Sequence, residues 1–184
     1  YKQKSTQVGI KTAVDLKKGK LNILYSHNII DRVFIDDSIK SRNGFDAYSK
    51  GAYKGKEHYI ETFAGIDLNK TVKLTFGADF RISNSDQLYS SIGFFGPFKS
   101  ELGKDSLKQN QLGIYAAATI ATQKGFNIEL GNRLNIHSEY GSNYGFNINP
   151  SYLINNKVKL FANLSSGYRV PSLYQLYSEY GNRK

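Results

Sequence analysis

The 184-residue sequence contains no cysteine, methionine or tryptophan, and only three prolines. Without cysteine the chain has no disulfides, thiolate metal sites or cysteine nucleophiles. No apolar stretch approaches the roughly 18 residues of a transmembrane helix. The sequence begins at Tyr1 and shows no signal peptide. We therefore expect a processed or truncated product, whose missing leader carries no information about localisation.

The net charge of +10 is typical of proteins that bind nucleic acid. Here, however, the lysines and arginines are scattered through turns and alternate positions, so we expect no nucleic-acid partner. An anionic membrane surface or solubility explains the charge. The three histidines, His27, His58 and His137, lie far apart, and no G-x-S-x-G, P-loop or dinucleotide motif occurs. The sequence therefore predicts a protein that is not an enzyme, with no catalytic residues, metal ligands or cofactor.

Aromatic residues make up 14% of the chain, and apolar residues alternate with polar ones at the period of two that is typical of β-strands. In residues 126–137, Ile128 and Leu130 share one face, and Glu129 and Arg133 share the other. The pattern predicts eight strands, at residues 8–16, 21–30, 56–68, 72–82, 111–122, 126–137, 144–154 and 158–164.

The connections between these strands alternate in length. Tight turns fall at residues 17–20, 69–70, 123–125 and 155–157, and longer polar links at residues 31–55, 83–108 and 138–143. In an antiparallel meander the tight turns then share one end and the long links the other, as in outer-membrane barrels. Most predicted strands have about 10 to 13 residues, enough for the roughly 9 to 11 residues that cross a bilayer.

These patterns predict an all-β fold, an antiparallel up-and-down meander of about eight long strands in a bacterial outer-membrane β-barrel. The apolar face, with Leu74 and Phe76, should contact lipid and lipopolysaccharide. The polar face should line the interior, and it carries Lys73, Asp79, Arg81, Glu61, Asp67, Glu129 and Arg133. A soluble sandwich would bury the same apolar face, so strand length and loop asymmetry decide between the two. We expect a bulge or bend at Pro150, because proline cannot donate to the ladder.

The C-terminal residues carry the most specific motif. Residues 168–177 read Tyr-Arg-Val-Pro-Ser-Leu-Tyr-Gln-Leu-Tyr, which resembles the motif aromatic-Arg-x-Pro-small-Leu-x-x-Leu-Tyr of TonB-dependent receptors. The matching residues are Tyr168, Arg169, Pro171, Ser172, Leu173, Leu176 and Tyr177. The likeness covers about the last 60 residues and is nearest to the cobalamin-receptor-like branch. We expect Tyr168, Arg169 and Pro171 to shape the strand end, with Arg169 facing inward against a carboxylate of the wall or plug.

The resemblance implies a large barrel of the 22-stranded type, an N-terminal plug domain and a box that contacts TonB. Neither plug nor TonB box is found in the sequence, so we expect residues 1–184 to be a fragment of the barrel domain. The implied function is a receptor and transporter for a scarce nutrient, such as cobalamin or a siderophore. The barrel wall and extracellular loops would form the substrate route, and the implied partners are the nutrient, the plug domain and the TonB complex.

Aromatic residues in two loops are candidate substrate contacts, because binding sites are concave and lined by aromatic side chains. They are Tyr89, Phe94, Phe95, Phe98, Tyr140 and Tyr144. The alternatives are that they pack on one another or join the aromatic girdle at the membrane interface. The acidic loop at residues 31–46 is a candidate Ca²⁺ site, although it lacks EF-hand spacing. Its oxygen-bearing residues are Asp31, Asp36, Asp37, Asn43 and Asp46.

Two other hypotheses stay open. A complete eight-stranded barrel with a structural or adhesin role would pair residues 8–16 with residues 158–169, because eight strands can close a barrel. A barrel enzyme such as a lipid hydrolase would need Ser, His and a carboxylate together, and His137 with Ser138 is the local pair that fits. A fragment would instead leave two strand edges unpaired. We expect that such a fragment would not insert stably into a bilayer alone.

Overall fold

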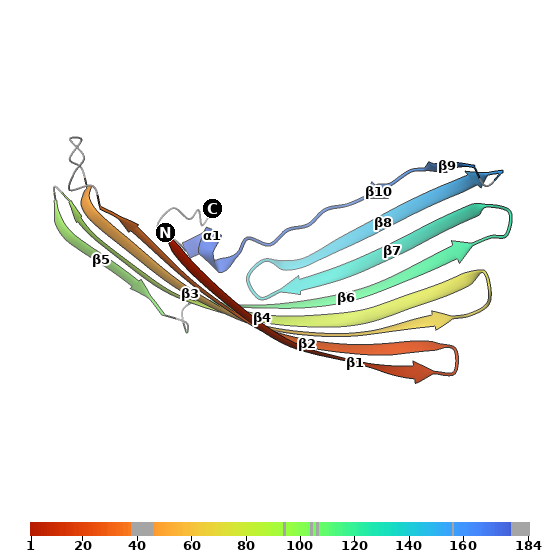
Figure 1. The fold of residues 1–184 in the computed structure, drawn as a ribbon, viewed down its shortest axis with the longest axis horizontal. Helices are drawn as coiled ribbons and strands as arrows, with labels where there is room; N and C mark the ends of the chain where they lie inside the picture. Colours follow the sequence, from red (N-terminus) through yellow and green to blue (C-terminus); the bar gives the residue numbers. More distant parts are fainter. Residues whose placement is uncertain (38–45, 94, 104, 106, 156, 178–184) are drawn as a thin grey trace.

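The computed structural model describes residues 1–37, 46–93, 95–103, 105, 107–155 and 157–177. It is dominated by one antiparallel sheet that curves into a trough (Figure 1). Its elements are β1 (Lys2–Leu16), β2 (Gly19–Asp36), β3 (Asp46–Asp67), β4 (Val72–Gly93), β5 (Gly96–Leu102), β6 (Lys108–Ala121), β7 (Phe126–His137), β8 (Gly141–Ile154), β9 (Val158–Phe161), β10 (Leu164–Ser165) and α1 (Leu173–Tyr177). Within these ranges, no helix is long and apolar enough to cross a membrane.

The strands follow one another across the sheet in chain order. The order is β1-β2-β3-β4-β6-β7-β8-β10, with β5 paired to the far end of β4 and β9 to the end of β8. Each pair is antiparallel, and β9 and β10 together occupy the place of the eighth predicted strand. The structure therefore confirms the predicted up-and-down meander.

The strands on the long-link side are longer than predicted. Both β3 and β4 have 22 residues, about twice the 9 to 11 residues that a bilayer requires. Residues 31–55 and 83–108, expected to be polar links, are largely the continuing arms of β2, β3 and β4 together with the added strand β5. The prediction was wrong because it relied on apolar alternation. Strand pairing continues beyond the bilayer, where both faces meet water and the outward side chains need not be apolar.

The bulge expected at Pro150 is not formed. β8 passes through Pro150 in continuous register with β7, from the pair Phe126–Tyr152 to the pair His137–Gly141. Instead, the missing N–H affects the neighbouring strand on the other side. Ala162 donates its N–H to the Pro150 carbonyl at 3.0 Å, but Pro150 has no N–H to return the bond. The interruption between β9 and β10 falls at this point.

Both side edges of the sheet are open. In the described part of the chain, β1 pairs with β2 alone and β10 with β8 alone. The pairing between residues 8–16 and residues 158–169 that a closed eight-stranded barrel requires is therefore not formed. The described structure therefore lacks the closure that the small-barrel alternative requires, and its open sheet has the form of a partial β-barrel.

The convex face of the sheet is apolar. The pairing register places Ile10, Tyr25, Ile60, Phe80 and Leu112 in one row across five strands. Parallel rows repeat this toward the short turns, and Phe76, Ile114 and Leu134 belong to them. All of these side chains except the half-buried Leu112 are exposed, with 71% of Ile10 and 46% of Phe76 accessible. A strip of such side chains across every strand is typical of a lipid-facing surface.

Candidate binding surface on the concave face

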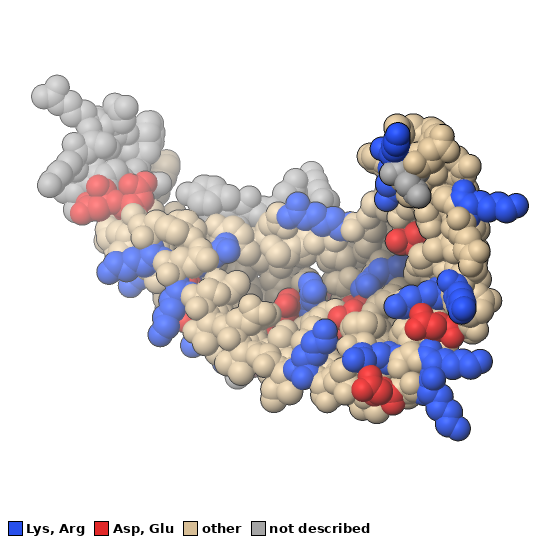
Figure 2. Space-filling model, turned by 45° about the vertical axis from the view of Figure 1, so that its right-hand side comes forward, with Lys and Arg blue, Asp and Glu red and all other residues tan. Residues whose placement is uncertain are grey.

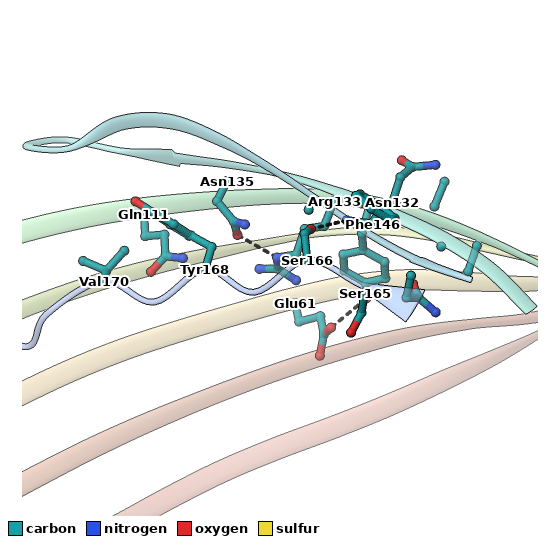
Figure 3. Close-up of a pocket in the computed structure, with 16 residues that line it drawn as sticks. Glu61, Gln111, Asn132, Arg133, Asn135, Phe146, Ser165, Ser166, Tyr168 and Val170 are labelled. Atoms are coloured by element: carbon teal, nitrogen blue, oxygen red, sulfur yellow. Dashed lines mark hydrogen bonds between the residues drawn. The ribbon is translucent and has the colours of Figure 1, made fainter. Parts of the chain in front are cut away.

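Charged side chains on the concave face form ion pairs and hydrogen bonds between strands. Arg133 on β7 reaches across Gly113 on β6 to Asp79 on β4, with Nη2 and Oδ2 2.6 Å apart. Its Nε donates to Asn135 Oδ1 at 2.7 Å, as Figure 3 shows. Asp79 is 5% exposed, and the contact with Arg133 offsets the cost of burying its carboxylate. The prediction that Asp79 and Arg133 face the interior is confirmed by this register.

Glycines provide the space for these side chains. Gly77 of β4 and Gly113 of β6 lie on the concave face. Gly77 pairs with Tyr115 of β6, and Gly113 pairs with Asp79 of β4. A Cβ at Gly113 would overlap Arg133 Nη2 and lie 2.6 Å from Asp79 Oδ2. A Cβ at Gly77 would lie 2.7 Å from Tyr115 Cζ. The glycines therefore let long polar side chains lie flat along the wall.

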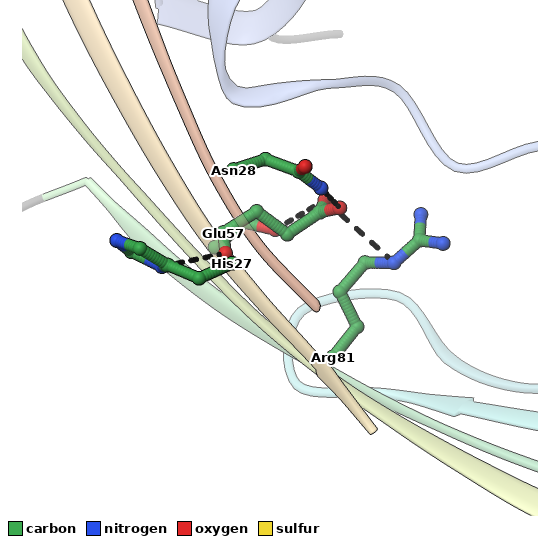
Figure 4. Close-up of polar contacts among 5 residues, drawn as sticks. His27, Asn28, Glu57 and Arg81 are labelled. Atoms are coloured by element: carbon green, nitrogen blue, oxygen red, sulfur yellow. Dashed lines mark hydrogen bonds and ion pairs between the residues drawn. The ribbon is translucent and has the colours of Figure 1, made fainter. Parts of the chain in front are cut away.

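A second polar cluster lies nearer the long loops and is centred on Glu57 of β3. Asn28 Nδ2 donates to Oε1 at 3.4 Å, Ser83 Oγ donates to Oε2 at 3.2 Å, and Arg81 Nε lies 3.6 Å from Oε2. Figure 4 shows Asn28, Glu57 and Arg81 on one side of the sheet and His27 on the other. His27 contacts the backbone carbonyl of Glu57 at 3.1 Å. The cluster joins β2, β3 and β4 through a single carboxylate.

The C-terminal segment folds back over the concave face (Figure 1). β10 ends at Ser165, and Ser172 caps the N-terminus of α1. In this capping box the Gln175 N–H donates to Ser172 Oγ, and the Ser172 N–H donates to Gln175 Oε1. The ring of Tyr174 packs edge-on against Tyr53 of β3, with centroids 4.9 Å apart. Arg32 of β2 lies over the same ring, its Cζ 5.6 Å from the centroid. These contacts tie the segment to the far side of the trough.

Two cavities lie between this segment and the wall, and they meet at Gln111 and Val170. The first has a volume of about 640 Å³ and is lined by Glu61, Tyr115, Arg133, Asn147, Ser166 and Tyr168, among others. The second has a volume of about 470 Å³ and is lined by residues that include Asn28, Arg32, Glu57, Arg81, Gln109 and Tyr174. Their linings are rich in amides, hydroxyls and charged groups, which suits water and polar solutes.

The structure places the candidate substrate contacts in two separate regions. Tyr89 and Phe98 lie on the concave side of the β4–β5 hairpin with ring centroids 6.3 Å apart, and Phe95 at its tip is 97% exposed. Phe94 lies outside the described residues. Tyr140 lies in the β7–β8 turn, and its ring is 5.0 Å from that of His137. Tyr144 is on the convex face, paired with Leu134, where aromatic side chains typically mark the membrane interface.

The hairpin and the β7–β8 turn do not meet. The turn lies at the level of Asn110, which pairs with Ile82 on β4. Tyr89 is seven residues further along β4, or roughly 23 Å of extended strand. A ligand held by both regions would therefore have to span the mouth of the trough.

The C-terminal family motif is divided between the strand end and α1. Leu173 and Leu176 are buried, and Gln87 donates to the Leu173 carbonyl at 3.4 Å. Arg169 contacts Gln175 Oε1 at 3.5 Å, within its own segment and not at a carboxylate of the wall. Neither α1 nor the contact of Tyr174 with Arg32 was predicted from the sequence. The capping-box spacing of Ser172 and Gln175 was the available signal for the helix.

His137 and Ser138, the candidate enzyme pair, form hydrogen bonds that stabilise the turn between β7 and β8. His137 Nδ1 accepts the backbone N–H groups of Glu139 at 3.0 Å and Tyr140 at 3.3 Å. Ser138 Oγ accepts the N–H of Asn110 at 3.1 Å. Among the described residues no three histidine or acidic side chains converge as metal ligands. Asn43 and the side chain of Asp46, part of the expected Ca²⁺ loop, lie outside the described residues.

A curved sheet with an apolar convex face, a polar concave face, tight turns at one end and long hairpins at the other is the wall of an outer-membrane β-barrel. The chain matches the family model described as TonB dependent receptor-like, beta-barrel over residues 1–184. It therefore belongs to this family, and the protein is a bacterial outer-membrane receptor and transporter. Members of the family are transporters and not enzymes. No curated protein matches the chain.

Proposed function

We propose that the protein takes up a scarce nutrient, such as cobalamin, an iron-siderophore or a similar compound, and that the concave face forms part of the route. The polar cavities under the C-terminal segment carry this proposal. Their donors and acceptors suit a solute that leaves water at the cell surface. A plug domain and the TonB complex would be the partners that open the route, as the family membership implies.

We also propose that residues 1–184 form one part of the barrel domain. Each open edge of the sheet exposes a row of N–H and C=O groups, and such edges are not tolerated in lipid. Further strands must therefore pair with β1 and with the β8–β10 side. Closing the wall in this way would enclose the concave face as a lumen, with room for a plug.

The long-loop end supplies the first contact with substrate in this proposal. Tyr89, Phe95 and Phe98 present aromatic rings on a hairpin that extends beyond the bilayer. The exposed rings of Phe95 and Phe98 can pack on an apolar or conjugated part of a nutrient, with the half-buried Tyr89 beside them. Tyr144, on the convex face, is not part of this proposed contact.

The uptake experiment uses the full receptor in its own outer membrane. A strain that lacks the receptor is supplied with wild type or with Phe95→Ala/Phe98→Ala, and energy-dependent accumulation of labelled cobalamin and ferric siderophores is measured. We expect wild type to restore accumulation of one class. The double variant should raise the half-saturating concentration about tenfold or more, because each ring contributes on the order of 1 kcal/mol.

The control is Phe161→Ala, which removes another exposed ring at the opposite, short-turn end. It should leave the half-saturating concentration unchanged. Accumulation that does not depend on the receptor or on cellular energy, for every nutrient tested, would contradict the proposed uptake. An equal effect of Phe161→Ala and the hairpin variant would contradict the proposed hairpin contact.

A further inference from the structure

The short-turn end of the sheet carries lysines at the tip of every turn. They are Lys17 and Lys18 between β1 and β2, Lys70 between β3 and β4, Lys124 between β6 and β7, and Lys157 between β8 and β9. We call these five residues the turn lysines. All five are exposed. Figure 2 shows lysine and arginine side chains in blue, both at this end and elsewhere on the molecule.

The acidic residues near this end do not neutralise the turn lysines. Asp15 pairs with Lys20 at 3.2 Å and Asp67 pairs with Lys73 at 3.9 Å. By the pairing register, all four of these residues lie on the concave face of the sheet. Within the described part of the chain none of the turn lysines has an ion-pair partner. Their positive charge is therefore available to anionic groups outside the protein.

The opposite end of the sheet is different. Asp31 stands directly across from both Lys4 and Lys54 in the pairing register. Lys99 pairs with Glu101 at 3.0 Å on β5. Lys4, Lys54 and Lys99 at the long-loop end therefore have an acidic residue beside them, whereas the turn lysines have no ion-pair partner among the described residues.

The turn lysines lie just beyond the apolar part of the convex face. The convex apolar residues end within a few positions of each turn, at Leu16, Val72, Phe126 and Ile154. A lysine immediately beyond such residues can lay its aliphatic stem on apolar surface and extend its ammonium into the headgroup layer. Short turns of outer-membrane barrels face the periplasm, so this layer belongs to the inner leaflet.

We propose that the turn lysines bind anionic phospholipids of the inner leaflet and hold them around this rim of the barrel. The occupant is a phospholipid with a net negative phosphodiester headgroup, of the phosphatidylglycerol or cardiolipin type. Spacing supports this assignment, because the charges are distributed over four neighbouring turns along the membrane surface. The proposal depends on the orientation of the barrel and is independent of which nutrient is taken up.

The test measures which lipid gathers at a turn. The full receptor, made free of other reactive cysteines, carries a fluorophore at Gln123→Cys, beside Lys124. It is reconstituted in phosphatidylcholine vesicles that contain a trace of phosphatidylglycerol or phosphatidylcholine, each with a nitroxide quencher high on an acyl chain. We expect phosphatidylglycerol to quench at least about twofold more efficiently, because each lysine near an anionic surface adds measurable attraction.

Two comparisons decide the outcome. Replacing the five turn lysines by glutamine, or raising the salt to 1 M where the Debye length falls to about 3 Å, should make the two lipids quench equally. The matched control replaces Lys2, Lys4, Lys54, Lys99 and Lys108 by glutamine and should keep the preference. Equal quenching in wild type, or a preference that survives loss of the turn lysines, would overturn the proposal.

Discussion

Phe76→Arg is expected to destabilise the inserted barrel by about 2 to 4 kcal/mol, the cost of an arginine on the lipid face near the bilayer midplane. Thr75→Arg, one residue earlier, is expected to change stability by less than about 1 kcal/mol. Phe76 lies on the convex face, in the row that contains Ala64 and Ala116. Thr75 lies on the concave face between Gly65 and Ala117, where a long polar side chain has room and meets water.

The measurement is urea unfolding of the full receptor in vesicles, supported by the shift in gel mobility that folded barrels show without heating. Both variants add one positive charge to the same strand, so charge alone cannot produce a difference between them. If Thr75→Arg were the more damaging, the apolar side of β4 would not be facing lipid.

Gly113→Ala is expected to cost about 1 to 3 kcal/mol, although it adds only one methyl group. The new Cβ would occupy the position of Arg133 Nη2 and force the guanidinium away from Asp79. Asp79 is almost completely buried, and hydrogen bonds to charged groups contribute about 1.5 to 3 kcal/mol. Partial exposure of Arg133 sets the lower end of the range, because water can partly replace the lost contact.

A double-mutant cycle separates this mechanism from general strain. In the Arg133→Ala background the overlapping guanidinium is gone and only the end of the Asp79 side chain must shift, so Gly113→Ala should cost clearly less than it does with Arg133 present. Gly55→Ala is the matched control on β3, since its Cβ would meet no atom within 4 Å. Equal costs for Gly113→Ala with and without Arg133, measured by urea unfolding, would rule out the ion pair as the cause.

The sequence predicted the membrane-spanning part of the fold well because two physical constraints act on each strand there. Lipid requires apolar residues on one face and the lumen accepts polar residues on the other, so Phe76 and Asp79 could both be assigned from a period of two. The alternation of tight turns and long links then predicted the antiparallel meander. Beyond the bilayer the first constraint disappears, and apolar alternation therefore predicts links where the structure has β5 and the outer arms of β3 and β4.

The concave site was predictable only in part. Alternation placed Glu61, Asp79 and Arg133 on one face, but the pairing of Arg133 with Asp79 depends on register across β6 and on a glycine at position 113. The contact between Tyr53 and Tyr174 joins residues that are far apart in the chain. It depends on the curvature of the sheet, which brings the C-terminal segment back to β3, and local sequence patterns do not encode that curvature.

The most direct test of the account asks what the convex face touches. The chain has no cysteine, so a nitroxide can be attached to single cysteines placed at each position from 72 to 82 of the receptor in vesicles. Collision rates with oxygen, which concentrates in the bilayer, and with a water-soluble nickel complex are then recorded. We expect oxygen collisions to peak at positions 74, 76, 78 and 80 and to fall at 73, 75, 77 and 79. Oxygen collisions that are equal along β4, or that peak at the odd positions, would contradict a lipid-facing convex surface.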